Sequence, residues 1–124
     1  MRRSEELAQT MIIRLVRMTI DLDRVDEFQA LFDQHRDQIR SAPGCTHLEL
    51  LRDTDQSNVF VTYSCWDSDQ VLQHYRNSDL FGTIWPKVKR LFAEAPQAWS
   101  FQRIQQGPEG TNLRSTPDPW TPDP

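Results

Sequence analysis

Histidine, tyrosine, tryptophan and arginine side chains in the first two thirds of the chain have the types needed to remove a proton from a ligand and to hold the resulting anion. An imidazole ring takes up and releases protons near neutral pH. Phenol and indole rings form an apolar surface for an aromatic ligand, and a guanidinium group pairs with an anionic oxygen. The residues that could fill these roles are His47, His74, Tyr63 and Trp66, with Arg14 or Arg17 as the cationic partner.

Several of these side chains also have a purely structural interpretation. Trp66 could fill the core at the end of a strand, and His74 could be an ordinary histidine on a helix surface. His47 fits either role. His35 continues the apolar stripe of a helix, so it is interpreted as a hydrogen-bonded core histidine.

Other common chemistries have no support in the sequence. No pair of histidines has metal-ligand spacing along one element, and no carboxylate completes a triad, so no metal site is expected. There is no glycine-rich phosphate loop of the kind that nucleotide cofactors need. Cys45 and Cys65 have no basic neighbour in sequence that would activate a thiol, and are interpreted as small buried apolar residues. The sequence therefore predicts a site without a metal or an organic cofactor.

Composition limits the class of protein further. The chain has 124 residues, of which 37% are hydrophobic and 26% charged, which suits one globular domain. No apolar run approaches the roughly 18 residues needed to cross a membrane, and the N-terminal residues lack a signal-like apolar region, so a cytoplasmic location is expected. The net charge of -4 and the absence of a clustered basic stripe argue against nucleic acid as a partner.

The elements that must position these side chains can be read from the hydrophobic pattern. Arg14 and Arg17 fall on opposite faces of the first strand, whereas Cys45, His47 and Glu49 alternate onto one face of the second. A proline at position 86 predicts a kink or a short break in the last helix. The pattern predicts strands over 11–20, 45–52, 59–66 and 98–104, and helices over 24–42, after Ser68 and after Ser78.

This order, β-α-β-β-α-α-β, predicts an α+β domain over residues 11–104 with the ferredoxin-like arrangement of an antiparallel sheet and helices on one face. The other face would expose apolar strand positions, so a homodimer that stacks two sheets into a barrel is expected. Residues 1–10 form an N-terminal extension. Residues 105–124 form a proline-rich C-terminal arm, which is expected to pack on folded protein through Trp120.

Two stretches of the sequence resemble a known family. The segments PGCTHLELLRD (43–53) and WDSDQVLQHYRNSDLF (66–81) are similar in order and spacing to the antibiotic biosynthesis monooxygenase family, and the likeness extends over about 11–104. The resemblance implies a dimeric ferredoxin-like α/β barrel. Members of this family include quinone-forming monooxygenases that need no cofactor, haem-degrading enzymes, and small proteins that bind or act on other ligands.

The haem-degrading branch fits this sequence poorly. Those members carry an asparagine on the first strand, a tryptophan at the end of the third and a histidine on the last helix. Trp66 matches the second feature, but the first strand has no asparagine and Trp85 stands where the histidine would fall. His74 matches instead a histidine common in the other relatives. No haem is therefore expected.

The resemblance thus implies a cofactor-independent monooxygenase that oxidises a small aromatic or quinol-type compound with dioxygen, in a pocket between sheet and helices. The alternative is a dimeric protein of the same fold that binds a small ligand without catalysis. The residues assigned to catalysis are His74, Trp66, Tyr63 and His47, and those assigned to the substrate pocket are Arg14, Arg17, Trp85 and Phe81.

Overall fold

The computed structural model of the 124-residue chain describes residues 10–108. The predicted docking of Trp120 therefore lies outside the described residues, as does most of the N-terminal extension. None of the helices that the structure describes is long and apolar enough to cross a membrane.

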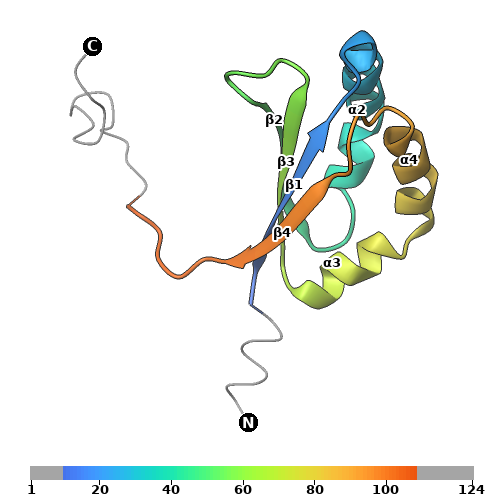
Figure 1. Cartoon of the computed structure of the whole chain (residues 1–124). Helices are drawn as coiled ribbons and strands as arrows, with labels where there is room; N and C mark the ends of the chain where they lie inside the picture. Colours follow the sequence, from blue (N-terminus) through green and yellow to red (C-terminus); the bar gives the residue numbers. More distant parts are fainter. Residues whose placement is uncertain (1–9, 109–124) are drawn as a thin grey trace, which may run out of the picture.

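The described residues form a four-stranded sheet and three α-helices, as predicted (Figure 1). The fold is α+β, and the predicted second crossover does consist of two helices separated by a short turn. The elements in chain order are β1 (Ile12–Thr19), the 3-10 helix η1 (Leu22–Arg24), α2 (Val25–Arg40), β2 (Cys45–Arg52), β3 (Val59–Trp66), α3 (Asp69–Arg76), α4 (Asp79–Lys89) and β4 (Gln97–Gln102).

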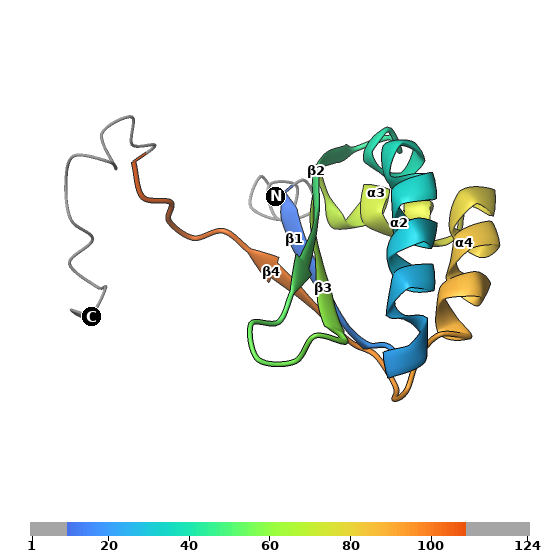
Figure 2. The same ribbon diagram turned by 90° about the horizontal axis from the view of Figure 1, so that it is seen from above.

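All neighbouring strands are antiparallel, and their order across the sheet is β2-β3-β1-β4. Figure 2 shows α2, α3 and α4 gathered on one side of the sheet, while no helix within residues 10–108 covers the other side. We call that uncovered side the open face. The predicted ferredoxin-like arrangement is therefore confirmed for one chain.

Local sequence signals explain where the helices begin and end. Ser68 and Ser78 cap α3 and α4, because each side chain accepts a hydrogen bond from a backbone N–H in the first turn. Gly44 follows α2 with a φ of 84°, in the left-handed region that glycine adopts without strain. The chain turns there and enters β2.

Proline at position 86 does not break α4, which runs from Asp79 to Lys89 without interruption. Pro86 lacks the N–H that would bond to the carbonyl of Gly82. Both residues are exposed, so water can take the place of the missing bond. The predicted break is therefore wrong.

β2 departs from the regular alternation that the sequence predicts. Its pairing with β3 shifts between Cys45 and His47, as in a β-bulge. Cys45 is consequently buried on the helix side beside Trp66 and Leu72, whereas His47 is exposed on the open face. The expectation that these two side chains share one strand face is wrong, because the extra residue reverses the alternation.

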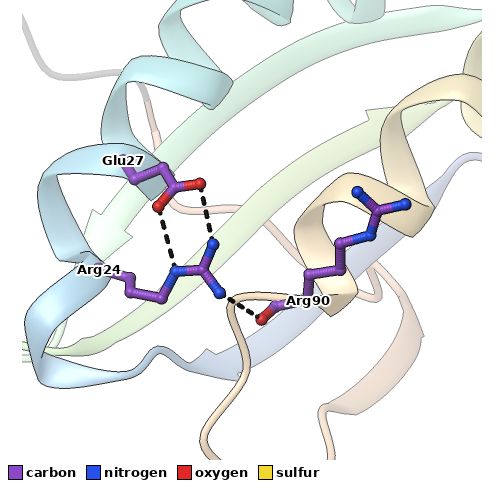
Figure 3. A network of polar contacts seen from close by, with 3 residues as sticks. All are labelled: Arg24, Glu27 and Arg90. Atoms are coloured by element: carbon purple, nitrogen blue, oxygen red, sulfur yellow. Dashed lines mark hydrogen bonds and ion pairs between the residues drawn. The ribbon is translucent and has the colours of Figure 1, made fainter.

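Arg24 joins two helices at one end of the molecule (Figure 3). Its guanidinium forms paired hydrogen bonds of 3.1 Å with both carboxylate oxygens of Glu27, and Nη1 donates to the backbone carbonyl of Arg90 at 3.0 Å. The start of α2 is thereby tied to the end of α4.

Candidate active site

A cavity of about 350 Å³ lies between the sheet and the helices. Apolar and aromatic side chains form most of its surface, with a few polar groups among them. β1 contributes Arg14, Val16 and Met18, β3 contributes Thr62, Ser64 and Trp66, α2 contributes Phe28, Leu31, Phe32, His35 and Ile39, and α3 and α4 contribute Leu72, Tyr75, Arg76, Phe81, Ile84, Trp85 and Val88. Small-molecule sites in proteins typically have this size and mixture of groups.

Four aromatic rings form a continuous row along the cavity. Trp66 stacks on Tyr75 with ring centroids 4.8 Å apart, and Tyr75 meets the edge of Phe81 at 5.3 Å. Phe81 in turn stacks on Trp85 at 5.6 Å. A flat aromatic ligand would meet ring faces and edges at several points of this row.

Trp66 serves both the core and the cavity. The side chain is only 1% exposed, and its indole N–H donates to the hydroxyl of Ser64 at 2.9 Å. Because that donor is already paired, the surface that Trp66 offers a ligand is its ring. The two interpretations of Trp66 from sequence are therefore compatible.

Tyr75 stands at the centre of the aromatic row. Burial raises the pKa of Tyr75 to about 12, with a smaller contribution from Cys45. Its hydroxyl therefore remains protonated at neutral pH and can donate a hydrogen bond. Tyr75 is not among the residues that the sequence assigns to the site, and its spacing of three residues from Leu72 was the signal available.

Two guanidinium groups belong to the cavity wall. Arg14 is half-buried and donates from Nη1 to the hydroxyl of Ser100 on β4 at 2.9 Å. Burial lowers the pKa of Arg14, and the positive charge of Arg76 lowers it further, while Asp69 opposes the shift. Arg14 stays charged despite this shift, since a guanidinium ordinarily titrates far above neutral pH. The wall thus favours a ligand that carries an anionic oxygen.

His35 is 8% exposed and lies on the α2 side of the cavity. Its Nδ1 is 2.9 Å from Oε1 of Gln38, and its Nε2 has no hydrogen-bond partner among the described residues. The sequence predicts a hydrogen-bonded core histidine here. The hydrogen bond is present, but its position on a cavity wall could not be read from helical spacing.

The structure separates the sequence-predicted residues into groups. Arg14, Trp66, Phe81 and Trp85 line the cavity together. His74 is exposed on α3 and is not among the residues that line it.

Other candidates from the sequence lie on the open face. His47 and Tyr63 line a shallow depression there, with ring centroids 5.5 Å apart, and His47 Nε2 lies 2.5 Å from a carboxylate oxygen of Glu49. Arg17 pairs with Val61 and Gln97, on the strand face opposite to that of Arg14. The sheet separates all three from the cavity.

Comparison with known proteins supports the same assignment of fold. A model of the family described as antibiotic biosynthesis monooxygenase matches residues 11–85. No curated protein matches the sequence. Among solved structures, a candidate antibiotic biosynthesis monooxygenase from Caulobacter crescentus is 19% identical with a TM-score of 0.74, over 85% of this chain and 100% of that one.

Two further solved structures are similar to this chain to about the same degree. A candidate antibiotic biosynthesis monooxygenase from Bordetella bronchiseptica is 24% identical, with a TM-score of 0.71 over 78% of this chain and 100% of that one. A point mutant of SnoaB, a cofactor-independent oxygenase from Streptomyces nogalater, is 20% identical, with a TM-score of 0.72 over 81% and 99% of the two chains. Since the family model spans more than half of the sequence, the chain belongs to the antibiotic biosynthesis monooxygenase family.

Proposed function

We propose that this protein is a monooxygenase that oxidises a small phenolic or quinol-type aromatic compound with dioxygen, using no metal or organic cofactor. The observation that carries the proposal is the cavity itself, in which a row of aromatic rings lies beside the guanidinium groups of Arg14 and Arg76. SnoaB, which has the same fold, is a cofactor-independent oxygenase.

The chemistry needs little beyond such a cavity. A phenol that loses its proton becomes an electron-rich phenolate, whose ring carbon reacts directly with dioxygen. One oxygen atom becomes the new carbonyl of a quinone and the other leaves as water, so that a phenol with an open ring position and one dioxygen give one quinone and one water. The substrate supplies all four electrons, and no other reductant is required.

The cavity residues would assist at two points. The charges of Arg14, which is half-buried, and of Arg76, which is exposed, stabilise the phenolate oxygen, and Arg14 contributes more because water screens it less. The aromatic row holds the ring plane and keeps water from the reactive carbon. Of these two contributions, the arginine charges are the one that favours the anion over the neutral phenol.

We also propose that the protein acts as a homodimer formed through the open face. The support is the exposure of Trp99, Phe101 and Leu51, whose side chains are 41%, 48% and 41% exposed. They lie on strands β4 and β2, at the two edges of the sheet. Burial of such a surface against a second copy would remove it from water.

The proposed activity is tested by measuring oxygen uptake with a panel of anthrones and hydroquinones. We expect one dioxygen consumed per substrate, with one labelled atom in the quinone when the gas is ¹⁸O₂. If a panel compound binds in the cavity but no oxygen is consumed above the rate without protein, the protein is a binding module and the proposed activity is wrong.

A further inference from the structure

The two arginines of the cavity carry charges that no lining residue neutralises. Arg14 on β1 and Arg76 on α3 both line the cavity, and no described aspartate or glutamate lines it. Within residues 10–108 neither guanidinium forms an ion pair. Arg14 donates to the hydroxyl of Ser100 and Arg76 donates to the amide oxygen of Gln73, and both of these acceptors are neutral. A ligand in the cavity therefore meets two positive charges.

These two charges lie close enough to act on each other. Burial lowers the pKa of Arg14, and the charge of Arg76 lowers it further, while Asp69 opposes the shift. The carboxylate of Asp69 is exposed, accepts a hydrogen bond from Nε2 of Gln73 at 3.2 Å, and does not line the cavity. A single phenolate oxygen would balance only one of the two guanidinium charges. The site thus has room for a second negative charge on the ligand.

Polarity changes along β1 from one end of the cavity to the other. Arg14 and Met18 line the cavity from the same side of the strand, four residues or about 13 Å apart. Arg14 pairs across the sheet with Ser64, whereas Met18 belongs to a buried apolar cluster with Phe28 and Val88. The cavity therefore has one cationic end and one apolar end, and it suits a ligand whose charged groups lie together at one end.

We infer that the substrate of this site is a phenol that also carries a carboxylate, with both groups at the same end of its ring system. This inference rests on the proposed function for the phenolic group, whose oxygen lies beside the half-buried Arg14. The carboxylate pairs with Arg76, which is exposed, so the carboxylate keeps part of its hydration. The unsubstituted end of the ring system lies towards Met18.

The balance of charge favours a carboxylate over a phosphate group. Carboxylate and phenolate together bring two negative charges to the two guanidinium groups. A phosphate monoester brings nearly two by itself at neutral pH, which would leave no positive charge for the phenolate. The planar guanidinium of Arg76 can also donate two parallel hydrogen bonds to the two oxygens of a carboxylate.

Three matched naphthols test the class of ligand with the full-length wild-type protein, by calorimetry under nitrogen at pH 7. In 4-hydroxy-2-naphthoate both groups lie on one ring, 4-hydroxy-2-naphthamide lacks the negative charge, and 5-hydroxy-2-naphthoate has its carboxylate on the other ring. We expect 4-hydroxy-2-naphthoate to bind about five- to tenfold more tightly than the amide, as one partly exposed ion pair with hydrogen bonds predicts. The 5-hydroxy isomer should bind more weakly than the 4-hydroxy compound, because only one of its two groups can reach the cationic end.

Two results of this comparison would contradict the inference. If the acid and the amide bind equally, or if the acid does not bind, the site does not select a carboxylate. If the 5-hydroxy isomer binds as tightly as the 4-hydroxy compound, the two groups do not share the cationic end.

A pair of variants isolates the contact with Arg76. Arg76→Gln should reduce the preference for the acid over the amide to less than about twofold, because the ion pair is lost. Arg90→Gln removes the same charge from an exposed residue at the end of α4 that does not line the cavity, so this variant should keep the preference. Added salt should weaken the preference in the wild type and not in Arg76→Gln. A preference that survives in Arg76→Gln would overturn the inference.

Oxygen uptake separates this inference from the proposed function. If neutral panel compounds are oxidised and kcat/KM is no higher for the acid than for the amide, the function stands and the inference is wrong. If no compound consumes oxygen but the binding preference depends on Arg76, the class of ligand stands and the oxygenase activity is wrong.

Discussion

Tyr75 shows at the level of one residue how the cavity and the stability of the fold are linked. Its ring stacks on Trp66 at 4.8 Å and meets the edge of Phe81 at 5.3 Å, so it belongs to the core and to the cavity wall at once. The burial that holds the ring in place also acts on its hydroxyl. A change in pH can therefore report on this packing.

Loss of the phenolic proton of Tyr75 should destabilise the folded protein in strong alkali. Burial raises the pKa of Tyr75 from 10.0 to about 12, so the unfolded chain loses the phenolic proton first. The stabilisation is fully present below pH 10 and is lost as pH rises through 12. Relative to Tyr75→Phe, the free energy of unfolding of the wild type should fall by about 2 kcal/mol over this interval. Urea unfolding of both proteins measures the difference, and parallel curves would contradict the burial of the hydroxyl.

Arg14 and Arg17 lie on opposite faces of the same strand, β1, which makes them a useful pair for comparison. Arg14→Gln should lower kcat/KM for an oxidised anthrone or hydroquinone about 10- to 100-fold, because it removes one of two cations beside the phenolate oxygen. Arg17→Gln should have a much smaller effect, because the sheet lies between it and the cavity. Steady-state kinetics of the two variants, with thermal melts to verify folding, provide the comparison. Equal losses in the two variants would contradict the assignment of the cavity as the active site.

At the scale of the elements, the turn from α2 into β2 depends on a single glycine. Gly44 has a φ of 84°, and a Cβ atom placed there would lie 2.5 Å from Cγ2 of Val71 on α3. The turn is therefore restricted both by its backbone conformation and by the helix packed against it. No other glycine in the described residues has a positive φ.

Gly44→Ala should destabilise the protein by about 2–5 kcal/mol, since left-handed strain and overpacking add. Gly82→Ala provides the control. Gly82 lies inside α4 with open space around its Cβ position, so alanine there should stabilise the protein by about 0.5–1 kcal/mol. Denaturant midpoints of the two variants should move in opposite directions. A Gly44→Ala protein as stable as the wild type would show that the turn relaxes freely.

The elements that the sequence predicts best are those fixed by local signals. β2 and β3 have the predicted bounds, because turn residues at Pro43-Gly44 and between the two strands mark their ends. The bulge after Cys45 was not predicted, since an extra residue in a strand changes no local propensity. It is detected only through the partner strand, and it decides which face His47 occupies.

The site was less predictable than the fold for the same reason. Period-two alternation shows that Arg14 and Arg17 oppose each other, but which of them faces the helices depends on how the whole sheet packs. His74 lies on an amphipathic helix whose apolar side is clear from sequence, yet a cavity at that side has no sequence signature. Tyr75, Arg76 and His35 reach the cavity through tertiary packing alone.

At the scale of the whole molecule, the open face is the surface through which a second copy would bind. Its apolar side chains come from β4 and β2, and among the described residues no helix covers them. A sheet with one uncovered apolar face is completed most simply by a second copy of itself. The dimer is therefore a prediction about this surface.

We expect the wild type to sediment as a dimer at micromolar concentration. Phe101→Glu should shift it to monomer, with the dissociation constant raised about 100-fold or more, since a buried unpaired carboxylate is strongly unfavourable. Leu22→Glu provides the control, because Leu22 is 71% exposed on η1 and outside the open face. Analytical ultracentrifugation measures the oligomeric state of the wild type and of the two variants. A monomeric wild type would refute the prediction.

The strand order of the sheet has a consequence for the newly made protein. β1 is central, but its second neighbour β4 comes last along the chain, and the Arg14–Ser100 contact joins residues 86 positions apart. During translation β1 leaves the ribosome early and can pair with β3 while one of its edges still lacks a strand. An unpaired strand edge is a template for pairing between chains. Nascent chains that stall before β4 emerges should thus be the form most prone to aggregation and most dependent on chaperones.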